Sequence, residues 1–162
     1  NYAPIAAALI LTTGEKEKGF VNFRSETYLE YKDDFKGQLV FSETKQKSMI
    51  TIDQTETYLD ACLACTEDSI KKFLEANEIS LNDIDLIIPS QTPHGLPEAL
   101  NQIPGLKDKT VMTDFELGEL HTAGPAFALE QIWNSQLFTS AQNILFVTVS
   151  AGITTAIALY RK

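Results

Sequence analysis

The sequence has few cysteines, little positive charge and no long apolar run. Its two cysteines, Cys62 and Cys65, cannot build a disulfide framework and favour a reducing cytoplasm. Basic residues number 13 against 22 acidic ones, and the formal net charge of −9 disfavours binding to nucleic acid or to anionic membranes. The longest apolar runs, such as residues 3–11, fall well short of a membrane-spanning helix, and no signal peptide is visible. These absences favour a cytoplasmic protein without membrane or nucleic-acid partners.

What is present is the composition of a globular protein. Apolar residues make up 44% and charged residues 22% of 162 positions, enough to bury a core of ordinary size. We expect residues 1–162 to form a single domain. The chain starts without Met, directly inside an apolar run, as a fragment cut from a longer protein would.

The order of periodic segments predicts an α/β fold with a mixed sheet and helices on its faces. A capping box of Asp53 and Glu56 is expected to open the first long helix, along an apolar stripe from Tyr58 to Leu74. Further helices are predicted at 96–103 and 122–136, and a tight antiparallel hairpin at residues 150–152. Strands are expected at residues 4–12, 19–27, 84–88, 110–115, 143–149 and 153–161, with two short extended pieces within 38–52.

Residues 82–95 are the stretch most indicative of a site. Their first half is a short buried strand, and their second half is small, polar and turn-forming. In an open α/β sheet, ligands and catalytic groups gather at the loops that leave the carboxyl ends of strands. The rim of a site is therefore expected at Ser90, Gln91, Thr92 and His94.

From residue 85 onward the pattern resembles the C-terminal half of a β-ketoacyl-acyl-carrier-protein synthase III, in the thiolase-like condensing-enzyme superfamily. Residues 85–89 resemble the strand that ends at the catalytic His of that family. Residues 111–113, Gly118 and residues 122–125 resemble the strand, loop and small-residue helix that supply its catalytic Asn. Residues 149–159 resemble its closing hairpin, and residues 6–11 resemble the last strand of its N-terminal half.

The resemblance implies half of a thiolase-like fold: a mixed, mostly parallel sheet of about five strands, with helices on its faces and a C-terminal antiparallel hairpin. It also places the last strand of the other half at residues 3–12. The implied chemistry is a decarboxylative Claisen condensation in fatty-acid or polyketide-type synthesis, catalysed by an acyltransferase. A nucleophilic Cys accepts an acyl group from acyl-coenzyme A or an acyl-carrier protein, and His and Asn stabilise the enolate oxygen. No metal and no further cofactor are implied.

The catalytic positions depart from the family pattern. Ser90 stands where the family has His, and Glu119 stands where it has Asn. A hydroxyl donates one hydrogen bond but does not replace an imidazole, and a carboxylate repels an enolate. His94 and His121 are candidate substitutes, against the simpler interpretation that both are local turn or helix-start residues. Gly152 of the hairpin remains as a candidate ligand contact.

Three hypotheses about function remain open. The chain is the C-terminal half of a condensing enzyme that is inactive without the other half, or a non-catalytic subunit that supports an active partner. The third hypothesis is a small hydrolase that uses Ser90 and His94, with Glu119 as the acid. The C-x-x-C of Cys62 and Cys65 lies on the apolar helical stripe, which favours core packing over redox or metal chemistry.

A homodimer is also expected. The helix predicted at residues 122–136 carries apolar side chains around its circumference, including Phe127 and Trp133. Such a helix requires cover on every side, and the matching helix of a second copy would provide it about a two-fold axis.

Overall fold

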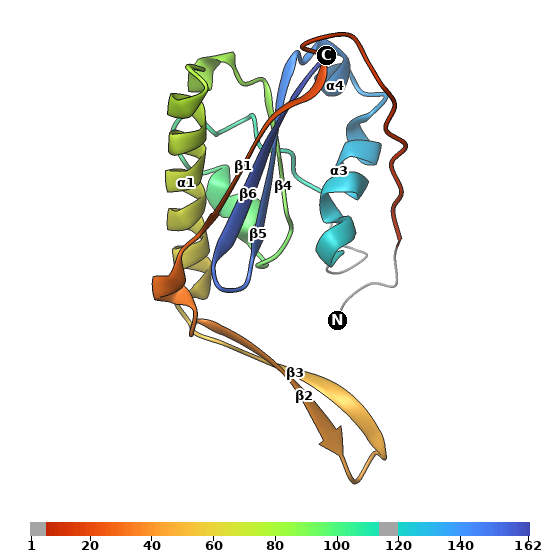
Figure 1. Ribbon diagram of the computed structural model, residues 1–162, viewed down its shortest axis with the longest axis vertical. Helices are drawn as coiled ribbons and strands as arrows, with labels where there is room; N and C mark the ends of the chain where they lie inside the picture. The colour runs from red at the N-terminus through yellow and green to blue at the C-terminus, as the bar shows by residue number, and fades with distance from the viewer. Residues whose placement is uncertain (1–5, 114–119) are drawn as a thin grey trace.

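The computed structural model describes residues 6–113 and 120–162, which form an α/β fold on a four-stranded sheet. The strands β1 (Gly19–Thr27), β4 (Leu86–Pro89), β5 (Asn143–Ser150) and β6 (Thr154–Arg161) lie in the order β1-β6-β5-β4. One face is covered by α1 (Tyr58–Ala76) and α2 (Leu96–Leu100), and the other by α3 (Gly124–Ile132) and α4 (Gln136–Ser140) (Figure 1). The predicted fold class is confirmed.

The strand directions differ in detail from the prediction of a mostly parallel sheet of about five strands. Only β4 and β5 pair in parallel, whereas β5–β6 and β6–β1 are antiparallel. Parallel pairing requires a crossover connection, and α2, α3 and α4 provide it between β4 and β5, whereas a tight turn joins β5 to β6. The strand predicted at 110–115 contributes a single parallel bridge from Thr110 to Ile87, and its last two residues lie outside the described ranges.

Strand β4 is buried on both faces, which explains its unbroken apolar sequence. Leu86 and Ile88 belong to the core cluster under α3, whereas Ile87 belongs to the cluster under α1. Strand β5 alternates in the same way, with Ile144 toward α3 and Leu145 toward α1. A strand between two helical layers cannot alternate apolar with polar residues, because both of its faces are core.

The apolar stripe of α1 is confirmed, but its predicted capping box is wrong. Asp53 lies in strand β3, and the helix begins at Tyr58 after Thr57, whose side chain makes no capping hydrogen bond. Because residues 47–54 pair with residues 35–42, Asp53 is held in an extended conformation, and the helix begins only at Tyr58. On the buried side of α1, Cys62 and Phe73 are completely buried.

A polar cluster joins α1 to the neighbouring strands β1 and β6 of the sheet. The Tyr28 hydroxyl donates to Asp68 Oδ2 at 2.7 Å and lies 2.8 Å from Ser69 Oγ, which in turn lies 2.6 Å from Thr155 Oγ1. Burial raises the pKa of Tyr28 far above its ordinary value, and the hydrogen bond from Arg24 lowers the pKa of Glu26. These hydrogen bonds fix the helix against β1 and β6 beside the apolar cluster under α1.

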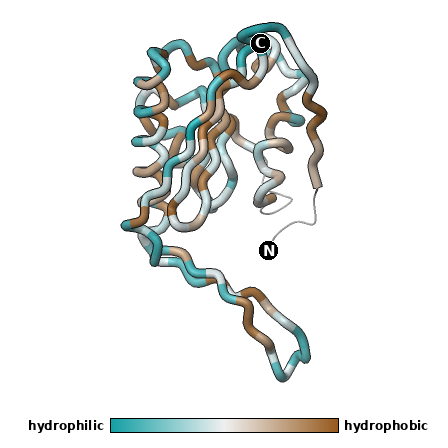
Figure 2. Tube along the Cα trace, viewed as in Figure 1, coloured by the Kyte–Doolittle hydropathy of each residue, from teal (hydrophilic) through white to brown (hydrophobic). Residues whose placement is uncertain are grey.

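Strands β2 (Phe35–Ser42) and β3 (Lys47–Gln54) form a separate antiparallel hairpin that extends from the body (Figure 1). This confirms the two extended pieces expected within 38–52. The paired positions 39 and 50 place Leu39 and Ile50 on one face, together with Phe41 and Ile52. All four side chains are exposed, and the apolar stretch is visible as brown tube in Figure 2.

The long helix predicted at 122–136 is interrupted. A 3-10 turn at His121–Ala123 precedes α3, which ends at Ile132, and Ser135 then caps α4 by accepting a hydrogen bond from Phe138 N. A serine that caps a new helix redirects the chain, and this local competition ends α3 early. The helix predicted at 96–103 likewise ends at Leu100, five residues after Gly95, whose φ of 88° opens it.

The described part of the first predicted strand is not a strand. Residues 6–12 have no regular structure and are exposed, because no sheet edge pairs with them. In the described part of the chain, no helix combines the length and the apolarity of a membrane span.

Candidate functional site

A cavity of about 420 Å³ lies where the carboxyl end of β4, the start of α3 and the β5–β6 turn meet. This is the edge of the sheet at which the sequence predicts a site. Hydroxyl-bearing and apolar side chains line it, and among the described residues none that lines it is charged. The lining residues are Phe35, Tyr58, Ser90, Thr92, Thr122, Pro125, Thr148, Val149, Ser150 and Ala151.

Ser90 is held rigidly at the inner wall of this cavity. Its hydroxyl donates to Thr92 O at 3.1 Å and accepts a hydrogen bond from Val149 N at 3.1 Å. Its backbone N–H donates to Val147 O at 2.7 Å, which continues the β4–β5 pairing by one residue. Since the hydroxyl proton is directed to a carbonyl oxygen, Ser90 connects two strands and is poorly placed to act as an activated nucleophile.

A second cavity of about 510 Å³ adjoins the first and contains His94. The two cavities share Phe35, Tyr58 and Thr92, whose side chains form the boundary between them. Ser90 lines the first cavity and the exposed His94 lines the second, so the structure places these two candidates on different sides of that boundary. The Thr92 hydroxyl oxygen is buried and has no hydrogen-bond partner within the described residues.

Gln91 connects the end of β4 to the start of α3. Its side chain is 1% exposed, and its Nε2 donates a hydrogen bond to Thr113 Oγ1. A Cβ added to Gly124 would lie 3.4 Å from Gln91 Cγ and Oε1, so the glycine allows the first turn of α3 to approach this side chain closely. The predicted rim of residues 90–94 is therefore divided: Gln91 supports the site from within the core.

The outcomes for the remaining candidate residues differ from one residue to the next. Glu119 and Gly118 are outside the described residues, so the predicted proximity of Ser90 and Glu119 stays a prediction. His121 begins the 3-10 turn before α3, next to Thr122 of the first cavity. Gly152 has a φ of 98° in the β5–β6 turn and is not among the cavity's lining residues, so this turn geometry accounts for the glycine.

Both cysteines lie in the core, and neither lines a cavity. Cys62 and Cys65 are buried in the cluster under α1, and no disulfide joins them. Burial raises the pKa of each thiol to about 11. In the part of the chain that the structure describes, no group of three His, Cys, Asp or Glu side chains could hold a metal ion.

Sequence reasoning missed Phe35, Tyr58 and Thr148 as cavity residues. Tyr58 belongs to the apolar stripe of the predicted helix, and this pattern predicts core packing. Its side chain is indeed only 2% exposed, although it also lines both cavities. Phe35 and Tyr58 contact each other with ring centroids 5.3 Å apart. This contact depends on the base of the hairpin lying against the start of α1, which no local pattern specifies.

The C-terminal part of the sequence matches a known protein family. Residues 74–162 match the family model described as 3-oxoacyl-[acyl-carrier-protein (ACP)] synthase III C terminal. The chain belongs to this family. The matched region contains β4, α3 and the β5–β6 turn, whereas the cavity residues Phe35 and Tyr58 lie before it.

Relatives and solved structures of synthase III cover nearly the whole chain. The chain is 26% identical to a β-ketoacyl-[acyl-carrier-protein] synthase III of Sulfurovum sp. (strain NBC37-1), over 94% of this chain and 47% of the relative. The identity is 24% with that of Aliarcobacter butzleri (strain RM4018), over 96% of this chain and 49% of the relative. The chain therefore spans about half the length of these relatives.

The fold comparison agrees. The 3-oxoacyl-(acyl carrier protein) synthase III structure from Pseudomonas aeruginosa PAO1 has a TM-score of 0.73 at 17% identity, over 92% of this chain and 46% of the other. A synthase III structure from Thermus thermophilus has a TM-score of 0.72 at 16% identity, over 91% and 47%. At these identities the likeness shows the shared synthase III fold alone.

The role of Ser90 in joining the strands is testable. We expect Ser90→Ala to lower the free energy of unfolding by about 1–3 kcal/mol, because the buried Val149 N–H loses its acceptor. Urea unfolding followed by circular dichroism measures this change. The control is Ser48→Ala on the exposed hairpin strand β3, with an expected change below about 0.5 kcal/mol. Equal stabilities for the two variants would contradict the proposed role.

Proposed function

We propose that this chain forms the C-terminal half of an acyltransferase site of the synthase III type, which carries out decarboxylative Claisen condensation in fatty-acid or polyketide-type synthesis. A nucleophilic thiol would come from a second half, on the same or another chain. The observation that carries this proposal is the cavity at the carboxyl end of β4, bordered by the β5–β6 turn and the start of α3, whose described lining residues are all uncharged. Family membership supports the same reading.

The lining of the first cavity fits an extended, neutral acyl chain in thioester linkage. Phe35 and Tyr58 offer apolar surface where the cavities adjoin, and Thr92 offers a hydroxyl at the same place. Among its described lining residues, the first cavity has no charged side chain that would bind a phosphate or a free carboxylate. Acyl-coenzyme A or an acyl-carrier protein would present such a chain with its charged portion outside the cavity.

The described residues supply shape to this site and little chemistry. The Ser90 hydroxyl is engaged by Thr92 and Val149, so it has little capacity to stabilise an enolate oxygen. A carboxylate at Glu119 would oppose the negative charge of an enolate. These features also favour the second candidate, a non-catalytic subunit that supports an active partner.

The isolated chain is therefore expected to have no condensing activity. With malonyl-carrier protein and acyl-coenzyme A, release of carbon dioxide should equal that of a sample without protein, because both thiols are buried and largely protonated. Mass spectrometry of the same sample should find no acyl adduct. Carbon dioxide release that disappears in the double variant Cys62→Ala, Cys65→Ala would contradict the proposal of a half-site.

Binding can be tested separately from catalysis. We expect a short-chain acyl-pantetheine thioester to shift the amide NMR signals of Thr92, Thr148 and Ala151. The variant Ala151→Trp should abolish these shifts by filling the first cavity. An absence of shifts at millimolar thioester in the folded chain would contradict an acyl-binding role.

The hydrolase hypothesis has no observation in its favour. Ser90 donates its proton to a backbone carbonyl, and His94 lines the neighbouring cavity. A serine nucleophile needs a base that accepts its proton, and the contact with Thr92 O does not provide one.

We also propose that the chain forms a homodimer. The sheet face that carries α3 also bears an aromatic cluster, in which Phe20 contacts Phe146 and Tyr160 with both centroid distances 5.3 Å. Phe23 is 71% exposed on the same face, and Trp133 after α3 is 50% exposed. Apolar surface of this extent is rare on soluble monomers.

A further inference from the structure

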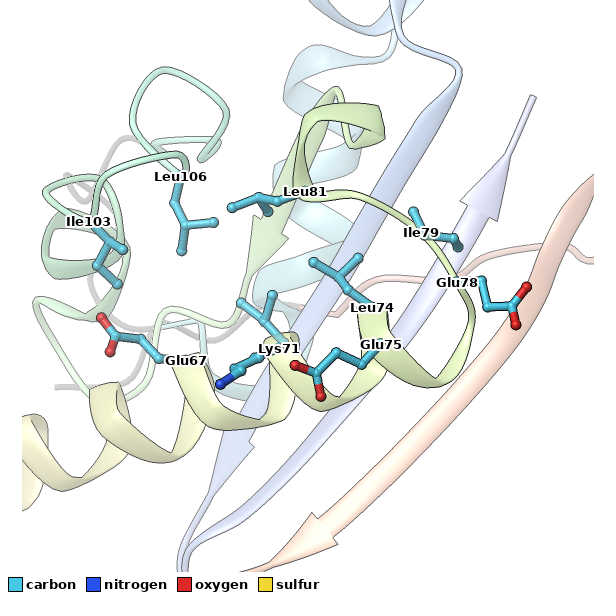
Figure 3. A pocket seen from close by; sticks show the side chains of 10 residues that line it. Glu67, Lys71, Leu74, Glu75, Glu78, Ile79, Leu81, Ile103 and Leu106 are labelled. Carbon is cyan, nitrogen blue, oxygen red and sulfur yellow. The ribbon is translucent and has the colours of Figure 1, made fainter.

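An apolar groove of about 440 Å³ lies at the carboxyl-terminal end of α1, and no residue that lines it lines either cavity of the proposed site. Leu74 comes from α1, Leu81 from the turn after it, and Ile103 and Leu106 from the loop after α2 (Figure 3). The groove is thus formed by three separate segments of the chain. Ile70 and Ile79 complete its apolar wall.

The rim of the groove carries an excess of negative charge. Glu67, Glu75 and Glu78 are exposed at the groove, and Lys71 is the one cation among the described residues that line it (Figure 3). The nearby Lys109 donates to Leu81 O at 2.8 Å and is not a lining residue. The net charge of the lining side chains is therefore negative, with three carboxylates against one ammonium.

The negative charges of Glu75 and Glu78 lie at the carboxyl-terminal end of α1, where they are electrostatically unfavourable. The last turn of α1 contains Glu75 and no basic residue. A helix carboxyl terminus carries partial negative charge and favours cations, so carboxylates in and just after the last turn are destabilising within the chain alone. A cation supplied from outside would remove this local conflict, and the apolar floor indicates that the cation belongs to an amphipathic ligand.

We propose that this groove docks an amphipathic segment of a partner protein, with apolar side chains on the groove floor and lysines or arginines at the carboxylate rim. A helix with anchors at i, i+3 or i+4, and i+7 matches such a groove. Anionic segments are disfavoured by the same rim. The proposal is independent of the acyl-binding site, since the groove shares no lining residue with it.

The test uses a fluorescein-labelled 12-residue amphipathic peptide of Leu and Lys, with fluorescence anisotropy as the readout. We expect the double variant Glu75→Lys, Glu78→Lys to weaken binding at least ~10-fold, through loss of rim complementarity and new like-charge repulsion. The matched control is Glu17→Lys, Glu43→Lys, which changes the net charge equally at exposed carboxylates that do not line the groove. This control should weaken binding less than ~3-fold.

Two companion peptides separate the contributions of the floor and the rim. A peptide with Ser in place of Leu keeps the charge and is expected not to bind, and a peptide with Glu in place of Lys is expected not to bind either. Equal weakening in both double variants, or equal binding of the Ser peptide, would overturn the proposal. Sedimentation that shows self-association lost only in the Glu75→Lys, Glu78→Lys variant would also overturn it, since the occupant would then be a second copy.

Discussion

Replacement of Phe73 by Ala is expected to lower the free energy of unfolding by about 3–5 kcal/mol. Phe73 is completely buried on α1, in the cluster that includes Leu145 and Leu159 of the sheet. Its removal costs the transfer free energy of the ring and leaves a cavity between the helix and the sheet that the neighbours fill only in part. A loss of this size is a large fraction of the ~5–15 kcal/mol that stabilises a typical domain.

Urea unfolding followed by circular dichroism measures the effect of Phe73→Ala. The matched control is Leu29→Ala, since Leu29 is 69% exposed and its truncation should change the stability by less than about 0.5 kcal/mol. If the two variants were equally stable, α1 would not pack on the sheet through Phe73, and the placement of Tyr58 at the cavities would lose its support.

The thiols of the folded chain are expected to react with a disulfide reagent at least ~100-fold more slowly than those of the unfolded chain. Burial raises the pKa of Cys62 and of Cys65 from 9.0 to about 11. Each pKa unit changes the thiolate fraction at neutral pH about tenfold, and the thiolate is the reactive species. Restricted access of the reagent to these buried side chains slows the reaction further.

Absorbance of the released chromophore at neutral pH, with and without denaturant, measures both rates. The single variants Cys62→Ala and Cys65→Ala assign the rate to each thiol. Fast labelling of either cysteine in the folded chain would place an exposed, activated thiol on α1. Such a thiol could serve as a nucleophile within this chain, and this result would contradict the proposed half-site.

Much of the fold was predictable because its signals are local. The run of Leu86, Ile87 and Ile88 is buried on both faces, and the alternation of β5 and β6 around Gly152 forms the predicted hairpin. The position of Ser90 at the end of β4 indicated where the site lies, since ligand sites follow strand ends. The order of these segments was also sufficient to indicate the synthase III family that the comparison shows.

The wrong predictions concern segments in which a local sequence pattern competes with pairing between distant segments. Asp53 and Glu56 have the spacing of a capping box, but β3 pairs with β2 and holds Asp53 in a strand. Residues 6–12 have strand-like composition, yet no edge strand pairs with them. Intrinsic propensity describes which conformations a segment can adopt, and its hydrogen-bond partners in the fold determine which of them it does adopt.

The sequence by itself determined the layered α/β architecture, the core faces of β4 and α1, and the strand end at which the first cavity lies. Only the tertiary structure decided that Ser90 donates its proton to Thr92 O, that His94 lies across the boundary formed by Thr92, and that Phe35 meets Tyr58. Hydrophobic periodicity is a local property that each segment carries in its own residues. A cavity, by contrast, is lined by segments up to about a hundred positions apart, and their contact depends on how all the layers pack.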